Sequence, residues 1–361
     1  MPEPRTAHPY YLYDAIHAQP ALIEKVLAHR DAIERAADAA AKKERVTFVG
    51  IGTSLHAAQI AELWMREFTG GRLWAHFEQS FELVNHLIAF GERDAVVVIT
   101  HTGTTTASIA ALRAARAKGA LTIAITGELS GAEIRGADFQ IETCEQEVSF
   151  AYTKSYTTAL AALAMLTLRI AERKNLVAPG AYAQEAERIP ELVRQPLAIE
   201  PQIREVAKKM ALSRIVIFGA GVGWPTAREG ALKIKESCYI AAEGFETEEV
   251  LHGPFSELDS RAALVAILSG RASDDRARQI LRAAGEIGTL RIAITPPSAN
   301  RDVSADQILV VPEAPEWLSA FIQIVPLQLL SYFTALARGL NPDTGRQDQP
   351  AHAAASKHYK Y

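Results

Sequence analysis

Two stretches of the chain repeat each other at one fixed spacing of 169 residues. Leu112-Arg113-Ala114-Ala115 returns as Leu281-Arg282-Ala283-Ala284, and the apolar run at 121–126 returns at 290–295. The same spacing carries Gly50-Ile51-Gly52 onto Gly219-Ala220-Gly221. Because two separate segments agree on one register, the sequence predicts a duplicated α/β domain.

Short apolar runs alternate with helical stretches in both copies. Strands are expected at 46–49, 73–77, 95–99 and 121–125 in the first copy, and at 215–218, 263–268, 291–294 and 308–311 in the second. Helices are expected near 54–68, 104–118, 155–173 and 316–338. This alternation is typical of a mainly parallel sheet with helices on both faces, which is a three-layer α/β/α sandwich.

The same pattern divides the chain into five parts. We expect an N-terminal helical arm at 1–43, a first α/β domain at 44–175, a helical linker at 176–212, a second α/β domain at 213–340 and a C-terminal tail at 341–361. The linker contains several prolines among charged helical pieces, and the tail turns irregular after Gly339.

The composition argues against several classes of function. The net charge is −4 with no basic run, and only 7% of residues are aromatic, so we expect no nucleic-acid partner. The first ten residues lack the basic and apolar pattern of a signal peptide, and the apolar stretches are short or interrupted by charge. These features predict a cytoplasmic protein without a membrane partner. Cys144 and Cys238 have no CxxC or His-rich surroundings, so neither a disulfide nor a metal site is expected.

Two loops of the first copy are rich in hydroxyl groups. Residues 50–54 follow the first strand, and 100–106 follow the third with five threonines in seven positions. Glycines let the backbone approach a ligand, and helix N–H groups together with side-chain hydroxyls can surround a phosphate. This pattern favours a phosphate site, although Ser and Thr also cap helices in many proteins.

A dinucleotide site is the competing interpretation of the first loop. Gly50-x-Gly52 opens a helix, and Glu78 follows the next strand where a ribose-binding acid would lie. The third glycine is missing because position 55 is Leu. We therefore expect no nicotinamide cofactor.

The second copy carries a candidate acid/base group. Glu229, Lys233 and Glu236 share one helix face at spacings of four and three residues, and His252 precedes Gly253-Pro254. A carboxylate and a histidine together can move protons near neutral pH. The alternative is a solvated set of ion pairs and a histidine that only shapes a turn.

The ordered motifs of this chain resemble those of the double-SIS sugar-phosphate isomerase family, and in particular the isomerase half of glucosamine-6-phosphate synthase. The resemblance extends from about His8 to the C-terminus. The motifs that carry it are Gly50–Ser54, Thr100–Thr105, Tyr152-Thr153-Lys154-Ser155-Tyr156-Thr157-Thr158, Glu229–Glu236 and Leu251-His252-Gly253-Pro254.

The resemblance implies two tandem SIS domains, a homodimer and a hexose 6-phosphate ligand, with neither metal nor cofactor. It implies that Glu236 moves the proton between C1 and C2, that His252 assists ring opening from the partner subunit, and that Lys357 forms a Schiff base. The residues implied to hold the phosphate are Gly52, Thr53, Ser54, Thr100, His101, Thr102 and Thr105, and those implied to contact the sugar are Phe150, Ala151, Lys233 and Ser356.

The sequence also departs from the family pattern. The usual Ser-Gln-Ser-Gly-Glu-Thr reads Thr100-His101-Thr102-Gly103-Thr104-Thr105, which adds an imidazole and removes a carboxylate. The tail lacks the family's Arg and Leu before the Schiff-base lysine, so Lys357 and Lys360 both stay candidates.

The synthase takes ammonia from an N-terminal amidotransferase domain that begins with a nucleophilic Cys, whereas Pro2 follows Met1 here. We therefore expect the degradative direction, with glucosamine 6-phosphate converted to fructose 6-phosphate and ammonia. The alternatives are a deglycase for fructosamine-type 6-phosphates, a ketose–aldose isomerase, or a sugar-phosphate sensor without catalysis.

Overall fold

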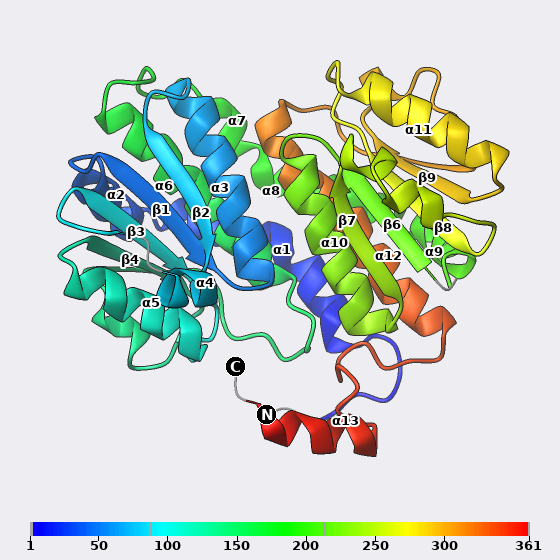
Figure 1. Ribbon diagram of the computed structural model, residues 1–361, viewed down its shortest axis with the longest axis horizontal. Coiled ribbons are helices and arrows are strands. Elements are labelled where there is room, and N and C mark those ends of the chain that lie inside the picture. Colours follow the sequence, from blue (N-terminus) through cyan, green and yellow to red (C-terminus); the bar gives the residue numbers. More distant parts are fainter. Residues whose placement is uncertain (1–2, 87–88, 212–213, 360–361) are drawn as a thin grey trace. The chain divides into compact units, whose positions relative to one another are not determined.

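A computed structural model of the protein describes residues 3–86, 89–211 and 214–359, and it contains two five-stranded parallel sheets (Figure 1). The first sheet has the strand order β2-β1-β3-β4-β5. Its strands are β1 (Arg45–Gly50), β2 (Trp74–Gln79), β3 (Asp94–Ile99), β4 (Leu121–Thr126) and β5 (Phe139–Glu142).

The second sheet repeats the topology of the first. Its order is β10-β9-β8-β6-β7, which is the order of the first sheet when it is read from the other edge. Its strands are β6 (Arg214–Gly219), β7 (Ala241–Glu246), β8 (Ala262–Ile267), β9 (Leu290–Thr295) and β10 (Gln307–Val310). The duplication predicted from the repeat is therefore confirmed, and so is the α/β fold.

Helices cover both faces of the first sheet. The helices α2 (Asp31–Ala40), α3 (Thr53–Thr69) and α6 (Lys154–Arg173) pack together on one face. The short α4 (Ser80–Asn85) and α5 (Thr106–Ala117) pack on the other, over a core that contains Val96, Val98 and Leu112. The central strand β3 is buried at every position because both of its faces are covered.

The second sheet is covered in the same way. The helices α9 (Glu200–Lys209), α10 (Gly223–Cys238) and α12 (Glu316–Ala337) lie together, and α11 (Asp274–Glu286) packs on the opposite side over Leu264 and Ala266. By length and composition α12 is the one helix among the described residues that could cross a membrane, but 89% of its apolar window is buried inside the protein. This burial is that of a core helix.

The two compact units interleave along the sequence. One comprises the described residues of 1–18, 148–153 and 191–345, and the other those of 19–147, 154–190 and 346–361. The remaining elements are α1 (Tyr11–Ala28), α7 (Ala183–Glu187), α8 (Ile189–Arg194), α13 (Pro350–Ala355) and, among the described residues, six short 3-10 turns. Of these turns, η3 (Glu249–Leu251) precedes His252 and η6 (Ser356–His358) contains Lys357. The domain boundaries given above stay a prediction.

Candidate functional site

The loop after β1 makes a tight turn into α3. A Cβ atom at Gly50 would lie 2.4 Å from the backbone carbon of Ser54, so only glycine fits there. Gly52 has a φ of 57°, which is the left-handed region that favours glycine. Thr53 then begins α3, and it is half-buried together with Ser54. The turn thus presents two hydroxyls at a helix N-terminus, where backbone N–H groups favour anions.

The loop after β3 is held by backbone hydrogen bonds. Thr100 is buried and donates its N–H to the carbonyl of Ile125 at 3.0 Å, and the carbonyl of Thr102 accepts from the Gly131 N–H at 2.9 Å. The side chain of Thr102 accepts from the Thr104 hydroxyl at 2.8 Å. Thr105 stands just before α5 and is half-buried. The threonines therefore line a fixed loop rather than a loose one.

The two loops lie at one edge of the first sheet. The strands β1 and β3 pair in parallel, with Val49 opposite Val98, so both loops leave the sheet at its carboxyl end. The chain continues from β1 to β2 on one side and to β3 on the other, which makes this the topological switch point. Ligands of open parallel sheets bind at such points. The structure brings the predicted phosphate residues Gly52, Thr53, Ser54, Thr100, His101, Thr102 and Thr105 to this edge.

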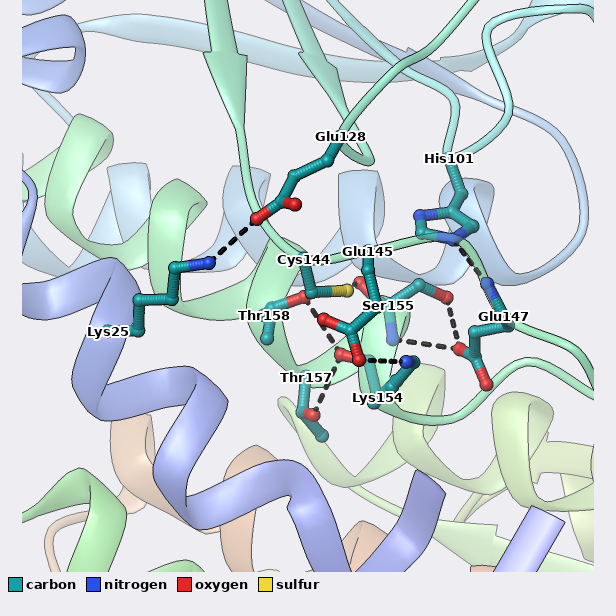
Figure 2. A network of polar contacts seen from close by, with 10 residues as sticks. All are labelled: Lys25, His101, Glu128, Cys144, Glu145, Glu147, Lys154, Ser155, Thr157 and Thr158. Carbon is teal, nitrogen blue, oxygen red and sulfur yellow. Dashed lines mark hydrogen bonds and ion pairs between the residues drawn. The ribbon is translucent and has the colours of Figure 1, made fainter. Parts of the chain in front are cut away.

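The His101 side chain is turned toward a neighbouring segment of the same unit (Figure 2). Its Nε2 accepts a hydrogen bond of 3.1 Å from the backbone N–H of Glu147. Burial, followed by the nearby Lys154 cation, lowers the pKa of His101 to about 4. The imidazole is therefore neutral at pH 7, and it brings no positive charge to the loop.

A short acidic segment before α6 was missed by the sequence analysis. Glu147 accepts hydrogen bonds from the Ser155 N–H at 2.8 Å and from its hydroxyl at 2.6 Å, while the Lys154 ammonium pairs with Glu145 (Figure 2). Ser155 lies in the first turn of α6, so Glu147 satisfies an N–H group that has no partner within the helix. The signal that was available is the pair of glutamates just before the Tyr-Thr-Lys-Ser motif.

The candidate acid/base residues of α10 form a buried cluster. The Lys233 ammonium lies 3.3 Å from Glu229 and 2.6 Å from Glu236. The side chains of Lys233 and Glu229 are 1% and 0% exposed, whereas that of Glu236 is 20% exposed. These residues are therefore not the solvated ion pairs of the alternative interpretation, and of the three only Glu236 is partly exposed to solvent.

A network of hydroxyls supports this turn of α10. The Lys233 carbonyl accepts from Ser237 at 2.7 Å and from Ser331 of α12 at 3.0 Å, and the two serine oxygens are 2.5 Å apart. All three residues are buried. The position of the Lys233 backbone is thus fixed from two helices.

His252 and the predicted sugar contacts of the same unit have different surroundings. The His252 side chain is 67% exposed, follows η3 and lies 3.8 Å from a Glu248 oxygen. Phe150 donates its N–H to the Asp343 carbonyl at 3.0 Å, and its ring leaves no room for a Cβ at Gly345. Ala151 is fully buried.

The predicted tail residues lie at the end of the described chain. Ser356 is half-buried and donates its hydroxyl to the Ala353 carbonyl at 3.0 Å, and Lys357 is exposed in η6. Lys360 lies outside the described residues.

The cysteines and possible metal ligands were also located. Cys144 and Cys238 are buried free thiols, and burial raises the pKa of Cys144 to about 11 and that of Cys238 to about 12. Within residues 3–86, 89–211 and 214–359, no three His, Cys, Asp or Glu side chains gather as a metal site.

Comparison with known proteins identifies the family. The SIS domain model matches residues 40–169 and 211–338, so the chain belongs to the SIS-domain proteins. It is 32% identical over 358 residues to the glutamine–fructose-6-phosphate aminotransferase (isomerizing) of Thermococcus kodakarensis. That match covers 95% of this chain but only 58% of the relative, so the chain spans little more than half of the relative's length.

Two solved structures show the same fold. The C-terminal domain of glucosamine-fructose-6-phosphate aminotransferase from Francisella tularensis is 25% identical, with a TM-score of 0.86 and coverage of 94% of this chain and 99% of the other. Glucosamine-6-phosphate deaminase from Thermotoga maritima is 21% identical, with a TM-score of 0.73 and coverage of 92% and 97%. The predicted family is therefore confirmed, and the latter likeness concerns the fold alone.

Proposed function

We propose that the protein shifts a proton between C1 and C2 of an amino-hexose 6-phosphate and releases ammonia, converting glucosamine 6-phosphate to fructose 6-phosphate. The observation that carries this proposal is the sealed Glu229–Lys233 pair beside the partly exposed Glu236. The buried cation holds the neighbouring carboxylate in place, so Glu236 can act as the acid/base group on a bound ligand.

The chemistry balances with water as the only co-reactant. The phosphate binds the hydroxyl loops at the edge of the first sheet. After ring opening, Glu236 takes the proton from C2 while the aldehyde oxygen at C1 gains a proton, which gives an enolamine. Glu236 then returns its proton to C1 as the nitrogen loses one N–H proton, so that C1 carries a hydroxyl and the bond from C2 to nitrogen becomes an imine. Water then adds to this imine, and the bond to nitrogen breaks to give the ketone and ammonia.

The first test measures ammonia and fructose 6-phosphate released from glucosamine 6-phosphate. Glu236→Gln should lower turnover by about 10² to 10⁴ while the ligand still binds, because only the proton transfer is lost. Glu67→Gln is the matched control, since Glu67 precedes Glu236 by 169 residues and is exposed in α3. Wild-type protein that makes no ammonia would contradict the deaminase.

Related activities share almost all of these residues and form the next arms of the test. Release of an amine from a fructosamine-type 6-phosphate would identify a deglycase, and exchange between hexose 6-phosphates without ammonia would identify a ketose–aldose isomerase. Binding of fructose 6-phosphate without turnover of any substrate would favour a sensor. Whichever of these activities is found, its loss in the Glu236→Gln variant would show that it depends on Glu236.

We also propose that His252 acts on the active site of a second subunit in a homodimer. Its imidazole is exposed on the single chain and is therefore accessible to another copy. Mixed dimers of Glu236→Gln and His252→Ala chains test this. If His252 acts across the interface, one of the two sites in a mixed dimer regains both intact residues and activity returns. If it acts within its own chain, each site keeps one defect and the mixture stays inactive.

The role of Lys357 in a Schiff base is a separate proposal that rests on the family pattern. Its exposed side chain lies on a short helical tail. Borohydride reduction in the presence of fructose 6-phosphate should fix the sugar covalently on the chain, and peptide mapping should locate it on Lys357. Label on Lys360 alone would move the role to that residue.

A further inference from the structure

Glu147 and Ser155 flank the short segment at which the chain passes from one compact unit to the other and back. Residues 148–153 belong to the other compact unit, so the chain leaves this unit after Glu147 and rejoins it at Lys154. The hydrogen bonds of 2.8 and 2.6 Å from Ser155 to the Glu147 carboxylate close the two ends of this excursion. The excursion carries Phe150 and Ala151, the predicted sugar contacts.

His101, which lies in the hydroxyl loop after β3, contacts Glu147 and so connects this loop to the hydrogen bonds between Glu147 and Ser155. Its ring accepts the Glu147 N–H at 3.1 Å (Figure 2). Its carbonyl accepts from the Gly127 N–H at 2.8 Å and from the Gln146 side chain at 3.3 Å. A Cβ at Gly127 would lie 2.5 Å from the His101 ring. The imidazole is therefore held between the loop after β4 and the segment before α6.

We propose that His101 and Glu147 are positioning residues: through their contact, the hydroxyl loop after β3 and the two ends of the excursion, at Glu147 and Lys154 of the same unit, are held in place. His101 then acts through its contacts and not as a cation on the phosphate. This inference rests on the proposed binding of a sugar phosphate at the hydroxyl loops. It also gives the family departure at position 101 a physical role.

The surroundings of the imidazole agree with this role. Glu145 and Lys154 are the charged groups that act on it electrostatically, and the Glu147 carboxylate is turned to Ser155. With burial as the larger effect, the pKa of His101 lies near 4, so the ring stays neutral between pH 5.5 and 8. A neutral ring with Nε2 as acceptor carries its proton on Nδ1.

The first experiment titrates wild-type protein with inorganic sulfate by calorimetry at pH 5.5 and pH 8. Sulfate stays a dianion over this range, whereas a phosphate monoester titrates near pH 6. We expect the affinity to change less than about twofold, because a neutral ring adds no charge. An affinity about tenfold higher at pH 5.5 would show a cationic His101 on the anion and overturn the proposal.

The second experiment is a double-mutant cycle read by fructose 6-phosphate affinity. His101→Ala and Gly127→Ala should each weaken binding roughly fivefold to tenfold, the scale of one or two lost hydrogen bonds. The double variant should bind no worse than His101→Ala, because the ring that the new methyl group would meet is gone and only the end of the flexible Gln146 side chain, 2.8 Å from the new Cβ, has to shift. Additive losses would contradict the proposal.

Glu147→Ala tests the second contact of the proposal, the hydrogen bonds from Ser155 to the Glu147 carboxylate. It keeps the backbone N–H to His101 but removes the acceptor of Ser155, so fructose 6-phosphate should bind several-fold more weakly while sulfate affinity stays near the wild-type value. Equal losses for both ligands would mean general damage to the unit. His29→Ala is the control, an exposed histidine of the same unit. Wild-type protein that binds neither ligand would refute the proposed function itself.

Discussion

The two copies of the domain share their topology but present different chemistry on the same loop. After β3, the first copy offers threonines, and α5 begins at Thr106. After β8, the second copy fills the loop with its own carboxylate, because Asp274 at the start of α11 accepts the N–H groups of Ser269 and Gly270 at 3.2 and 2.7 Å. In the proposed function the first loop binds the ligand, whereas the N–H groups of Ser269 and Gly270 in the second loop already have a carboxylate partner within the protein.

The helix that follows the first strand shows the opposite contrast. At the repeat spacing, the buried side chains Ile60 and Trp64 of α3 correspond to Glu229 and Lys233 of α10. These two positions are apolar in one copy and ionic in the other, whereas the third position of the face is a glutamate in both, Glu67 and Glu236. In the proposed function the duplication therefore separates tasks, since the hydroxyl loops lie in one unit and the candidate acid/base cluster lies in the other.

The largest effect is expected when the ionic face is partly converted to the apolar one. Lys233→Met leaves two carboxylates without their cation, and it should lower the free energy of unfolding by about 3–5 kcal/mol. Adding Glu229→Ile, as in the first copy, should restore most of the stability while turnover stays lost. Chemical denaturation and the ammonia assay on both variants separate the two effects. A double variant as unstable as Lys233→Met would show that the apolar pattern of α3 cannot be transferred.

A second difference concerns acid stability, because the first copy alone places a histidine in its loop, where the second has Ser269-Gly270. The pKa of His101 falls from 6.5 to about 4 on folding, so the unfolded chain binds the proton more tightly. The resulting stability is present above pH 6.5 and is lost as the pH falls through about 4, with an upper limit near 3 kcal/mol. Unfolding of wild type and His101→Gln between pH 7 and pH 4 measures it. Identical pH profiles would contradict the buried neutral imidazole.

Much of the fold could be predicted from the sequence, for a physical reason. The central strands β3 and β8 are buried at every position and therefore read as continuous apolar runs. The edge strands β5 and β7 were missed because polar or small residues interrupt their few large apolar ones, and each strand has only one buried position. The other two edge strands, β2 and β10, were predicted, so the weak signal comes from the residues of β5 and β7 and not from an edge position alone.

Those parts of the candidate site whose residues lie close together in one segment of the chain could be predicted from the sequence. The hydroxyl loops and the face of α10 are local patterns. The contact of His101 with Glu147 joins positions 46 apart, and no local spacing indicates it. Sequence also left open whether Glu229 and Lys233 are solvated or buried, because the packing of α10 against α12 decides this.

A smaller effect on stability is expected at the loop after β8 of the second copy, where Asp274 accepts hydrogen bonds from the backbone. Asp274→Ala leaves the N–H groups of Ser269 and Gly270 without the buried carboxylate, and it should cost about 1–3 kcal/mol of stability. The affinity for fructose 6-phosphate should not change, because this loop binds no ligand in the proposed function. Denaturation and calorimetry test the two statements, and a loss of ligand affinity without a loss of stability would place the second loop in the site.

The smallest effect is expected from exchanging single residues between the first loops. Thr53 of the first copy corresponds to Val222 of the second at the repeat spacing. Thr53→Val keeps the shape of the side chain and removes one hydroxyl, so fructose 6-phosphate should bind about fivefold more weakly. Val222→Thr adds a hydroxyl to a buried position and should leave the affinity unchanged. If both exchanges changed the affinity equally, the two copies would share phosphate binding, and the separation of tasks between them would be wrong.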